Sequence, residues 1–403
     1  MNSTWFLELA ASLSLQVALV VLATFLLTRF VRGPRFVGWM WSASYVVLLA
    51  LVLAALLLPH PRWIPRFGGE LSRPAASELL TLQIALGRTL FAVWLCGAIG
   101  LWAWMLAQSI RTARFLKTCQ EVPADHPALV ECRDVLNPFS TGSPGKSSVR
   151  VLSSAAVAGP FCWQFHRPCI VLPEFLLGLD PRELRFIVRH ELAHLRTGHP
   201  LQLFLQRVVE VLFWFHPLIW WAARQVSRSR EFACDDAAID RPAQVADYLR
   251  TLLIVVEHSA VESERGSPAL AFGRSAGIIA ERARRLAAIA RFGWPASSSR
   301  RRFVSACLAW SAIVAVSFGL WLPVDVTASP RSTWSPWPHW SANVLREFGV
   351  TARDFEVYDD RIELHEMLED AASRARPAAQ DRNSSEPGGV SSRTERQSKS
   401  SGG

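Results

Sequence analysis

The sequence has little charge and little tyrosine for its length. Of its 403 residues, 19% are charged and only 3 are tyrosine, whereas 50% are hydrophobic and 17 are tryptophan. The mean hydropathy is +0.19. An ordinary soluble domain carries a smaller apolar fraction and a larger charged fraction. The composition therefore excludes that class and favours a membrane protein.

A disulfide framework and a cysteine-rich metal knuckle are also missing. Seven cysteines are scattered along the chain. Cys96 and Cys307 fall in apolar runs, and Cys162 and Cys169 lack the spacing of a zinc knuckle. The odd number and the scatter fit reduced thiols in a cytosolic domain, which we interpret as small core residues.

The sequence also lacks a stripe of basic and aromatic residues, although its formal net charge is +9. In so apolar a chain, a positive excess is typical of arginines that flank membrane spans on the cytoplasmic side. We therefore predict contact with membrane lipid and no direct binding to nucleic acid.

The chain does have four apolar runs that are long enough to cross a bilayer. They cover residues 5–30, 37–58, 88–110 and 303–322. The first run is too long for the core of a signal peptide. Basic clusters follow the first and third runs and precede the fourth, at Arg29, Arg32, Arg35, Arg111, Arg114, Lys117, Arg300, Arg301 and Arg302. The positive-inside rule places all three clusters in the cytoplasm, which leaves both termini outside.

This arrangement predicts a multi-pass protein of the cytoplasmic membrane with four parts. Residues 1–110 form a three-span region, and residues 111–299 are long enough for a cytoplasmic domain. Residues 300–322 are the fourth span. Residues 323–403 are a short extracytoplasmic tail.

A well-marked helix begins near residue 180 in the predicted cytoplasmic domain. Asp180 is a typical N-cap, Pro181 suits the first helical position, and Glu183 completes the pattern of a capping box. Apolar residues then recur at helical spacing. Gly198 and Pro200 are expected to end the helix.

This helix carries His190, Glu191 and His194 in the pattern His-Glu-x-x-His. Positions i and i+4 share one helical face, so both imidazoles can bind one Zn²⁺ ion. Glu191 lies beside them and can reach a zinc-bound water as a general base. Two histidines at this spacing are more often structural, but the intervening glutamate on a capped helix favours a metal site.

A catalytic zinc site takes three protein ligands and keeps one position for water. Glu231 fits the third place, and Asp235 lies on the same face of the next predicted helix, four residues later. Asp235 would accept the free ring N–H of a ligand histidine and fix its orientation. The alternative is a solvated acidic face, or salt bridges to Arg228 or Arg230.

His199 competes with Glu231 for the third ligand place. The metzincin pattern places a third histidine six residues after the second. Here that position is Pro200, so His199 falls one residue short. We rank His199 below Glu231.

Residues 201–223 are apolar enough to be mistaken for a further span. Four polar side chains make a full crossing costly in lipid: Gln202, Gln206, Arg207 and Glu210. A crossing would also put Glu231 on the opposite side of the membrane from His190. We predict a helical hairpin that dips into the membrane face, with its corner near His216 and Pro217. The sequence leaves open whether the segment dips or crosses.

Two short strands are expected before the metal helix, at residues 149–152 and 169–172. An exposed edge of their sheet could hold a peptide as an added strand. The alternative is a strand pair that only supports the helix.

Together these residues resemble the BlaR/MecR family of membrane-embedded zinc metallopeptidases. The resemblance covers residues 5–322. It is carried by the spans and by six segments, at residues 167–173, 190–194, 213–217, 230–235, 245–249 and 281–286. It implies a mainly α-helical integral membrane protein, in which an α+β gluzincin-like zinc peptidase domain is inserted between the third and fourth of four transmembrane helices. In the family's antibiotic sensors this domain acts on a cytosolic repressor.

The tail departs from those antibiotic sensors, which carry a large penicillin-binding domain after the fourth span. Residues 323–403 contain no Ser-x-x-Lys motif, so β-lactam sensing is not expected. A small hairpin is expected around Asp359 and Asp360, and disorder from about residue 373. The tryptophans of the tail are expected at the membrane interface, namely Trp334, Trp337 and Trp340.

The main functional hypothesis is an integral-membrane, zinc-dependent endopeptidase that cleaves a protein or peptide, such as a cytosolic transcriptional repressor, in signal transduction. The alternative is a non-catalytic membrane sensor or scaffold that retains the peptidase fold. A transporter is disfavoured because the spans lack paired broken helices and midplane charges. The oligomeric state stays open, with a homodimer among the options.

Overall fold

The computed structural model describes residues 3–31, 33–61, 73–123, 125–136, 149–164, 167–264, 276–294, 300–324, 334–335 and 337–350. The hairpin expected around Asp359 and Asp360, and the segment from residue 373, lie outside these ranges. The described chain is mainly helical, with one small sheet.

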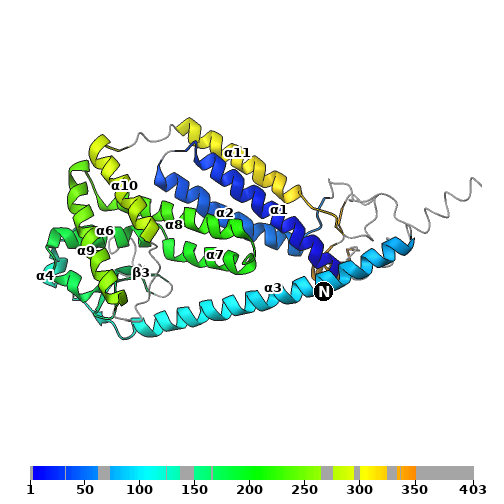
Figure 1. Ribbon diagram of the computed structural model, residues 1–403, viewed down its shortest axis with the longest axis horizontal. Helices are drawn as coiled ribbons and strands as arrows, with labels where there is room; N and C mark the ends of the chain where they lie inside the picture. The colour runs from blue at the N-terminus through cyan, green and yellow to red at the C-terminus, as the bar shows by residue number, and fades with distance from the viewer. Residues whose placement is uncertain are drawn as a thin grey trace, which may run out of the picture.

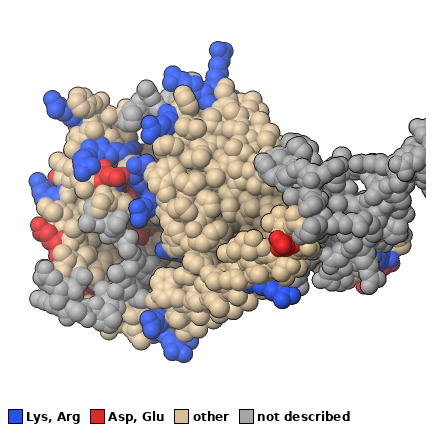
Figure 2. All heavy atoms as spheres, turned by 45° about the vertical axis from the view of Figure 1, so that its right-hand side comes forward, with Lys and Arg blue, Asp and Glu red and all other residues tan. Residues whose placement is uncertain are grey.

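A bundle of long helices forms one end of the molecule (Figure 1). Its elements are α1 (Ser3–Thr28), α2 (Pro34–Leu57), α3 (Arg73–Leu116) and α11 (Arg300–Gly319). In the described part of the chain, these four are long and apolar enough to cross a membrane. Figure 2 shows a broad uncharged surface over this bundle, with Lys and Arg side chains gathered beside it. This distribution supports a membrane protein, whereas the number of crossings stays a prediction.

Helix α3 is longer than the predicted span of residues 88–110. It has 44 residues and is therefore about 66 Å long, roughly twice the thickness of the hydrocarbon core of a bilayer. A hydropathy pattern detects only the apolar middle of such a helix. The more polar turns at both ends of α3 are helical too, but they do not raise the hydropathy.

Polar side chains of α1 that interrupt its apolar run are buried against the end of α11. Glu8 accepts a hydrogen bond from the indole of Trp321, and the Gln16 amide donates to the carbonyl of Leu320 over 2.8 Å. The hydroxyl of Ser12 accepts from the backbone N–H of Leu322 over 2.9 Å. These contacts join α1 to the three residues that follow α11 and give partners to two backbone groups and one indole there.

The other end of the molecule holds the sheet and the shorter helices (Figure 1). The strands are β1 (Gln120–Glu121), β2 (Arg150–Ser154), β3 (Phe161–Trp163) and β4 (Cys169–Pro173), in the spatial order β1-β2-β4-β3. The pairs β1–β2 and β3–β4 are antiparallel, whereas β2 and β4 are parallel. Strands β2 and β4 lie where the sequence predicts them, and β3 is an edge strand.

The helix with the His-Glu-x-x-His pattern is α6 (Pro181–Arg196), which follows the 3₁₀ helix η2 (Glu174–Gly178). The side chain of Asp180 caps it by accepting from the N–H of Arg182 over 2.8 Å. Its apolar face packs on β2, β4 and α4 (Pro127–Val130) in one buried cluster. A short α5 (Arg133–Leu136) follows α4.

A helical hairpin joins the two ends of the molecule. It consists of α7 (His199–Leu212) and α8 (Pro217–Ala238), with its corner between them, where the sequence predicts one. Its apolar residues share one buried core with α1 and α2. The chain then continues through the 3₁₀ helix η3 (Pro242–Gln244), α9 (Val245–Glu264) and α10 (Ala276–Phe292), and α12 (His339–Glu347) follows α11. That the hairpin dips into a membrane stays a prediction.

The corner of the hairpin is held against α3 at Gly97. The Trp214 indole lies over Gly97 so closely that a Cβ there would be 2.4 Å from its Cε2 atom. Two hydrogen bonds reinforce this contact: the Trp94 indole donates to the carbonyl of Leu212 over 2.9 Å, and the Trp214 indole donates to the carbonyl of Trp94 over 3.3 Å.

We expect Gly97→Ala to destabilise the protein by about 1–3 kcal/mol, because the new methyl group overpacks this contact. Gly100→Ala is the matched control, since a Cβ at Gly100 meets nothing within 4 Å and alanine is the better helix former. Thermal unfolding in detergent should show a lower midpoint for the first variant only. Equal midpoints would contradict the close approach.

Candidate metal centre

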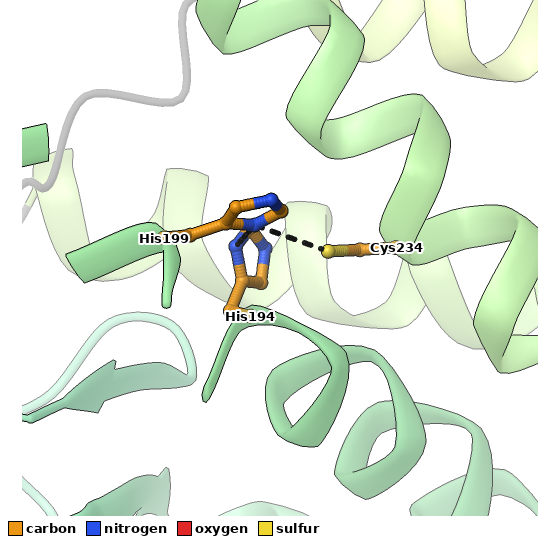
Figure 3. Close-up of side chains that lie close together, drawn as sticks. All are labelled: His194, His199 and Cys234. Carbon is orange, nitrogen blue, oxygen red and sulfur yellow. Dashed lines mark hydrogen bonds between the residues drawn. The ribbon is translucent and has the colours of Figure 1, made fainter. Parts of the chain in front are cut away.

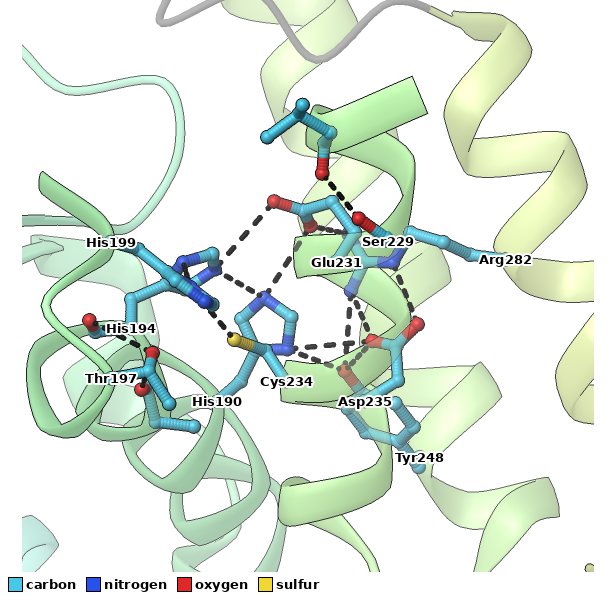
Figure 4. Close-up of polar contacts among 12 residues, drawn as sticks. His190, His194, Thr197, His199, Ser229, Glu231, Cys234, Asp235, Tyr248 and Arg282 are labelled. Atoms are coloured by element: carbon cyan, nitrogen blue, oxygen red, sulfur yellow. Dashed lines mark hydrogen bonds and ion pairs between the residues drawn. The ribbon is translucent and has the colours of Figure 1, made fainter. Parts of the chain in front are cut away.

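Three side chains meet with metal-ligand spacing between α6 and α8 (Figure 4). They are His190, His194 and Glu231, and we call them the metal group. The Nε2 atoms of His190 and His194 are 3.3 Å apart. Glu231 Oε2 lies 3.5 Å from His190 Nε2, and Glu231 Oε1 lies 3.6 Å from His194 Nε2. A tetrahedral zinc with ligand bonds of about 2.05 Å separates its ligand atoms by about 3.4 Å. The donor atoms and their spacing therefore fit zinc.

The packing of α6 against α8 produces this group. His190 and His194 are one turn apart on α6, and Glu231 projects from the facing helix α8. His190 is only 3% exposed, and the side chain of Glu231 is 17% exposed. Burial alone would raise the pKa of Glu231, but the neighbouring Arg282 and His190 hold that pKa well below its usual range. The carboxylate is therefore charged at neutral pH and suited to bind a cation.

Glu191 lies beside this group and is 2% exposed. It lines a pocket together with His190. The other lining residues come from the residue before β3 and from α6, α9 and α10: Pro160, Ile187, Tyr248, Thr251, Leu252, Val255 and Arg282. The pocket gives the Glu191 side of the metal group a mostly aliphatic wall.

Asp235 stands one turn after Glu231 and is fully buried. Its Oδ1 is 3.4 Å from His190 Nδ1 and accepts from the Tyr248 hydroxyl over 2.7 Å. The Tyr248 oxygen is in turn 3.1 Å from His190 Nδ1. Asp235 therefore lies at the ring nitrogen of His190 that faces away from Glu231, which is the place that the sequence predicts for it.

Arg282 of α10 binds both carboxylates of α8. It donates to Asp235 over 3.0 and 2.6 Å, and its third nitrogen lies 2.8 Å from Glu231 Oε2. Burial would raise the pKa of Asp235, but Arg282 and the hydrogen bond to His190 lower it to about 2. The face that Glu231 and Asp235 share is therefore a buried ionic cluster.

His199 does not join Glu231 at the metal group. Its Nδ1 lies 2.9 Å from His194 Nδ1, on the far side of that ring, and 3.6 Å from Cys234 Sγ (Figure 3). His194, His199 and Cys234 form a second group with metal-ligand spacing. Burial, and next the charge of His194, lower the pKa of His199 to about 2, so its ring is neutral.

A family model described as BlaR1 peptidase M56 matches residues 8–276 of the chain. The chain belongs to this family of peptidases. It is also similar to the regulatory protein BlaR1 of Bacillus licheniformis, at 23% identity over 278 residues. That alignment covers 59% of this chain and 43% of the relative, so the chain matches less than half of the length of BlaR1.

The family match includes all the predicted site residues of this M56 member, from His190 to Asp235. It also includes Tyr248 but ends before Arg282. Family membership therefore supports a membrane metallopeptidase, and the role of each residue is a proposal.

The sequence did not assign roles to Tyr248 and Arg282. Two signals were available: both residues fall in segments that carry the family resemblance, and a carboxylate in a buried site requires a counter-charge. The sequence offered Arg228 and Arg230, on α8 itself, as salt-bridge partners for Glu231 and Asp235, but the structure pairs both arginines with other residues. Arg228 lies 3.4 Å from Glu281, and Arg230 donates to Gln206 over 2.9 Å.

We expect Arg282→Gln to lower the free energy of unfolding of the metal-free protein by about 3–5 kcal/mol, because it leaves two buried carboxylates without their cation. The control is Arg228→Gln, whose ion pair with Glu281 is 42% and 41% exposed and contributes less than about 1 kcal/mol. Denaturant unfolding in detergent with a chelator measures both. Similar losses in the two variants would contradict a structural role for the buried pair.

Proposed function

We propose that the chain is an integral-membrane, zinc-dependent endopeptidase. The observation that carries the proposal is the meeting of His190, His194 and Glu231: the two Nε2 atoms are 3.3 Å apart, and each lies 3.5–3.6 Å from one carboxylate oxygen of Glu231. Glu191 lines the adjoining pocket. Membership of a peptidase family supports the same reaction class.

Each polar residue has a separate role in this proposal. His190, His194 and Glu231 hold the zinc, which when bound polarises a scissile carbonyl and lowers the pKa of its water toward ~7. Glu191 takes the proton of the attacking water and later passes it to the leaving amine. Asp235 and Tyr248 hold the ring of His190 from its other nitrogen, as outer partners of metal-bound histidines do.

The substrate that we propose is an extended segment of a cytosolic protein, such as a transcriptional repressor. The β3 strand is at the edge of the sheet in the described chain, and it packs beside α6. A peptide can pair with such an edge by backbone hydrogen bonds. Pro160, the residue before β3, lines the pocket with His190 and Glu191, so the beginning of this strand lies close to two residues of the proposed site. The regulatory function named for the BlaR1 relative favours a role in signalling.

We further propose that the peptidase domain is cytoplasmic and that the segment with α12 lies outside, because arginine clusters flank three apolar helices on one side. Single cysteines test this orientation in a variant without the native cysteines. With a membrane-impermeant maleimide on spheroplasts, Asn343→Cys should be labelled, whereas Asp247→Cys should be labelled only after lysis. Both positions are exposed, and the reverse pattern would overturn the orientation.

We expect Glu191→Gln to retain zinc and to lose peptide cleavage by about 10²–10⁴-fold, the usual contribution of general acid–base catalysis. New protein N-termini in cells that carry the wild type or the variant report cleavage, and the metal content of both purified proteins reports zinc. Glu183→Gln makes the same substitution on the same helix and should change neither quantity. Identical N-termini in wild type and Glu191→Gln would favour a non-catalytic scaffold.

A further inference from the structure

The two histidines of the metal group have different partners at their outer nitrogens (Figure 4). His190 Nδ1 faces Asp235 at 3.4 Å and the Tyr248 hydroxyl at 3.1 Å. His194 Nδ1 instead faces His199 Nδ1 at 2.9 Å. One ligand is therefore backed by a carboxylate and a phenol, and the other by a second imidazole.

The local backbone places His199 over His194. Helix α6 ends at Arg196, and Gly198 adopts a left-handed conformation with φ of +67°. The chain turns there, and α7 begins at once with His199. The two rings meet edge to face, with centroids 4.9 Å apart and an interplanar angle of 70°. Cys234 of α8 approaches the same nitrogen, with its Sγ 3.6 Å from His199 Nδ1 (Figure 3).

Binding of the proposed zinc by His194 fixes the tautomers. His194 Nε2 points toward His190 and Glu231, so this nitrogen needs its lone pair for the metal and the proton lies on Nδ1. His194 Nδ1–H is then a donor, and His199 Nδ1 must accept. The proton of His199 consequently lies on Nε2. His199 cannot bind a metal through Nδ1 while it accepts this hydrogen bond.

We propose that His199 is a positioning residue for the metal ligand His194. Its Nδ1 accepts the Nδ1–H of His194 and fixes that ring with Nε2 toward His190 and Glu231. The inference rests on the proposed zinc ligands, but it does not require that a peptide is cleaved. The competing arrangement is a metal bound by His194, His199 and Cys234, whose donor atoms also lie within 4.8 Å of one another.

The affinity for zinc alone tests the proposal on the purified full chain in detergent, by competition with a chelator. Outer partners of metal-bound histidines typically contribute 10–100-fold to metal affinity, so His199→Ala should weaken zinc binding by about this factor. His199→Asn should restore most of the loss, because its amide oxygen occupies the place of Nδ1 as an acceptor. A merely structural role would not be rescued by so small a side chain.

Two controls define the size of the effect. His258→Ala removes another imidazole, whose ring stacks on that of Phe175 with the centroids 3.7 Å apart. This variant should leave zinc affinity unchanged. His190→Ala removes a proposed ligand and should abolish tight binding. If His190→Ala leaves zinc binding intact, the proposed ligand set fails. If His190→Ala abolishes binding and His199→Ala does not weaken it, the positioning role alone fails.

Substitution of the zinc by Co²⁺ distinguishes the competing site. We expect no thiolate-to-cobalt charge-transfer band in the near-ultraviolet spectrum, and no change in that spectrum in Cys234→Ser. A strong band that disappears in Cys234→Ser would show that Cys234 is a ligand. That result would overturn the proposal in favour of the group of His194, His199 and Cys234.

Discussion

The guanidinium group of Arg282 is 1% exposed and pairs with two carboxylates inside the protein. The helices around the metal group all contact this ion cluster. Arg282 of α10 contacts Asp235 and Glu231 of α8, and Tyr248 of α9 and His190 of α6 bind the same cluster. Each of these charges is costly to bury alone. The cluster is therefore satisfied only when α6, α8, α9 and α10 are all in place, so the packing of all four helices positions the proposed metal ligands.

The parts of the site that follow from local spacing could be predicted from the sequence. His190 and His194 share a face because they are one turn apart, and the same rule pairs Glu231 with Asp235. Tyr248 and Arg282 could not be assigned, because their contacts depend on how α9 and α10 pack, and no spacing within either helix encodes that. The position of His199 depends on the φ of one glycine.

For the fold, too, the sequence predicts the elements that depend on a local pattern and misses those that depend on contacts between distant segments. The apolar runs, β2, β4 and the corner between α7 and α8 have clear local signals. Strand β3 has three residues and exists only through its pairing with β4. The full length of α3 was missed because hydropathy measures apolarity and not helicity.

Helix α3 has a further consequence for the molecule. It runs without a break from Arg73 to Leu116, passes the N-terminal end of α1 and ends four residues before β1 (Figure 1). On its way it carries the corner of the hairpin at Gly97. A continuous helix is a stiff rod, since bending it requires a proline, a bulge or a broken hydrogen bond. Tilting its projecting end would therefore move the β1 edge of the sheet and the corner of the α7–α8 hairpin together.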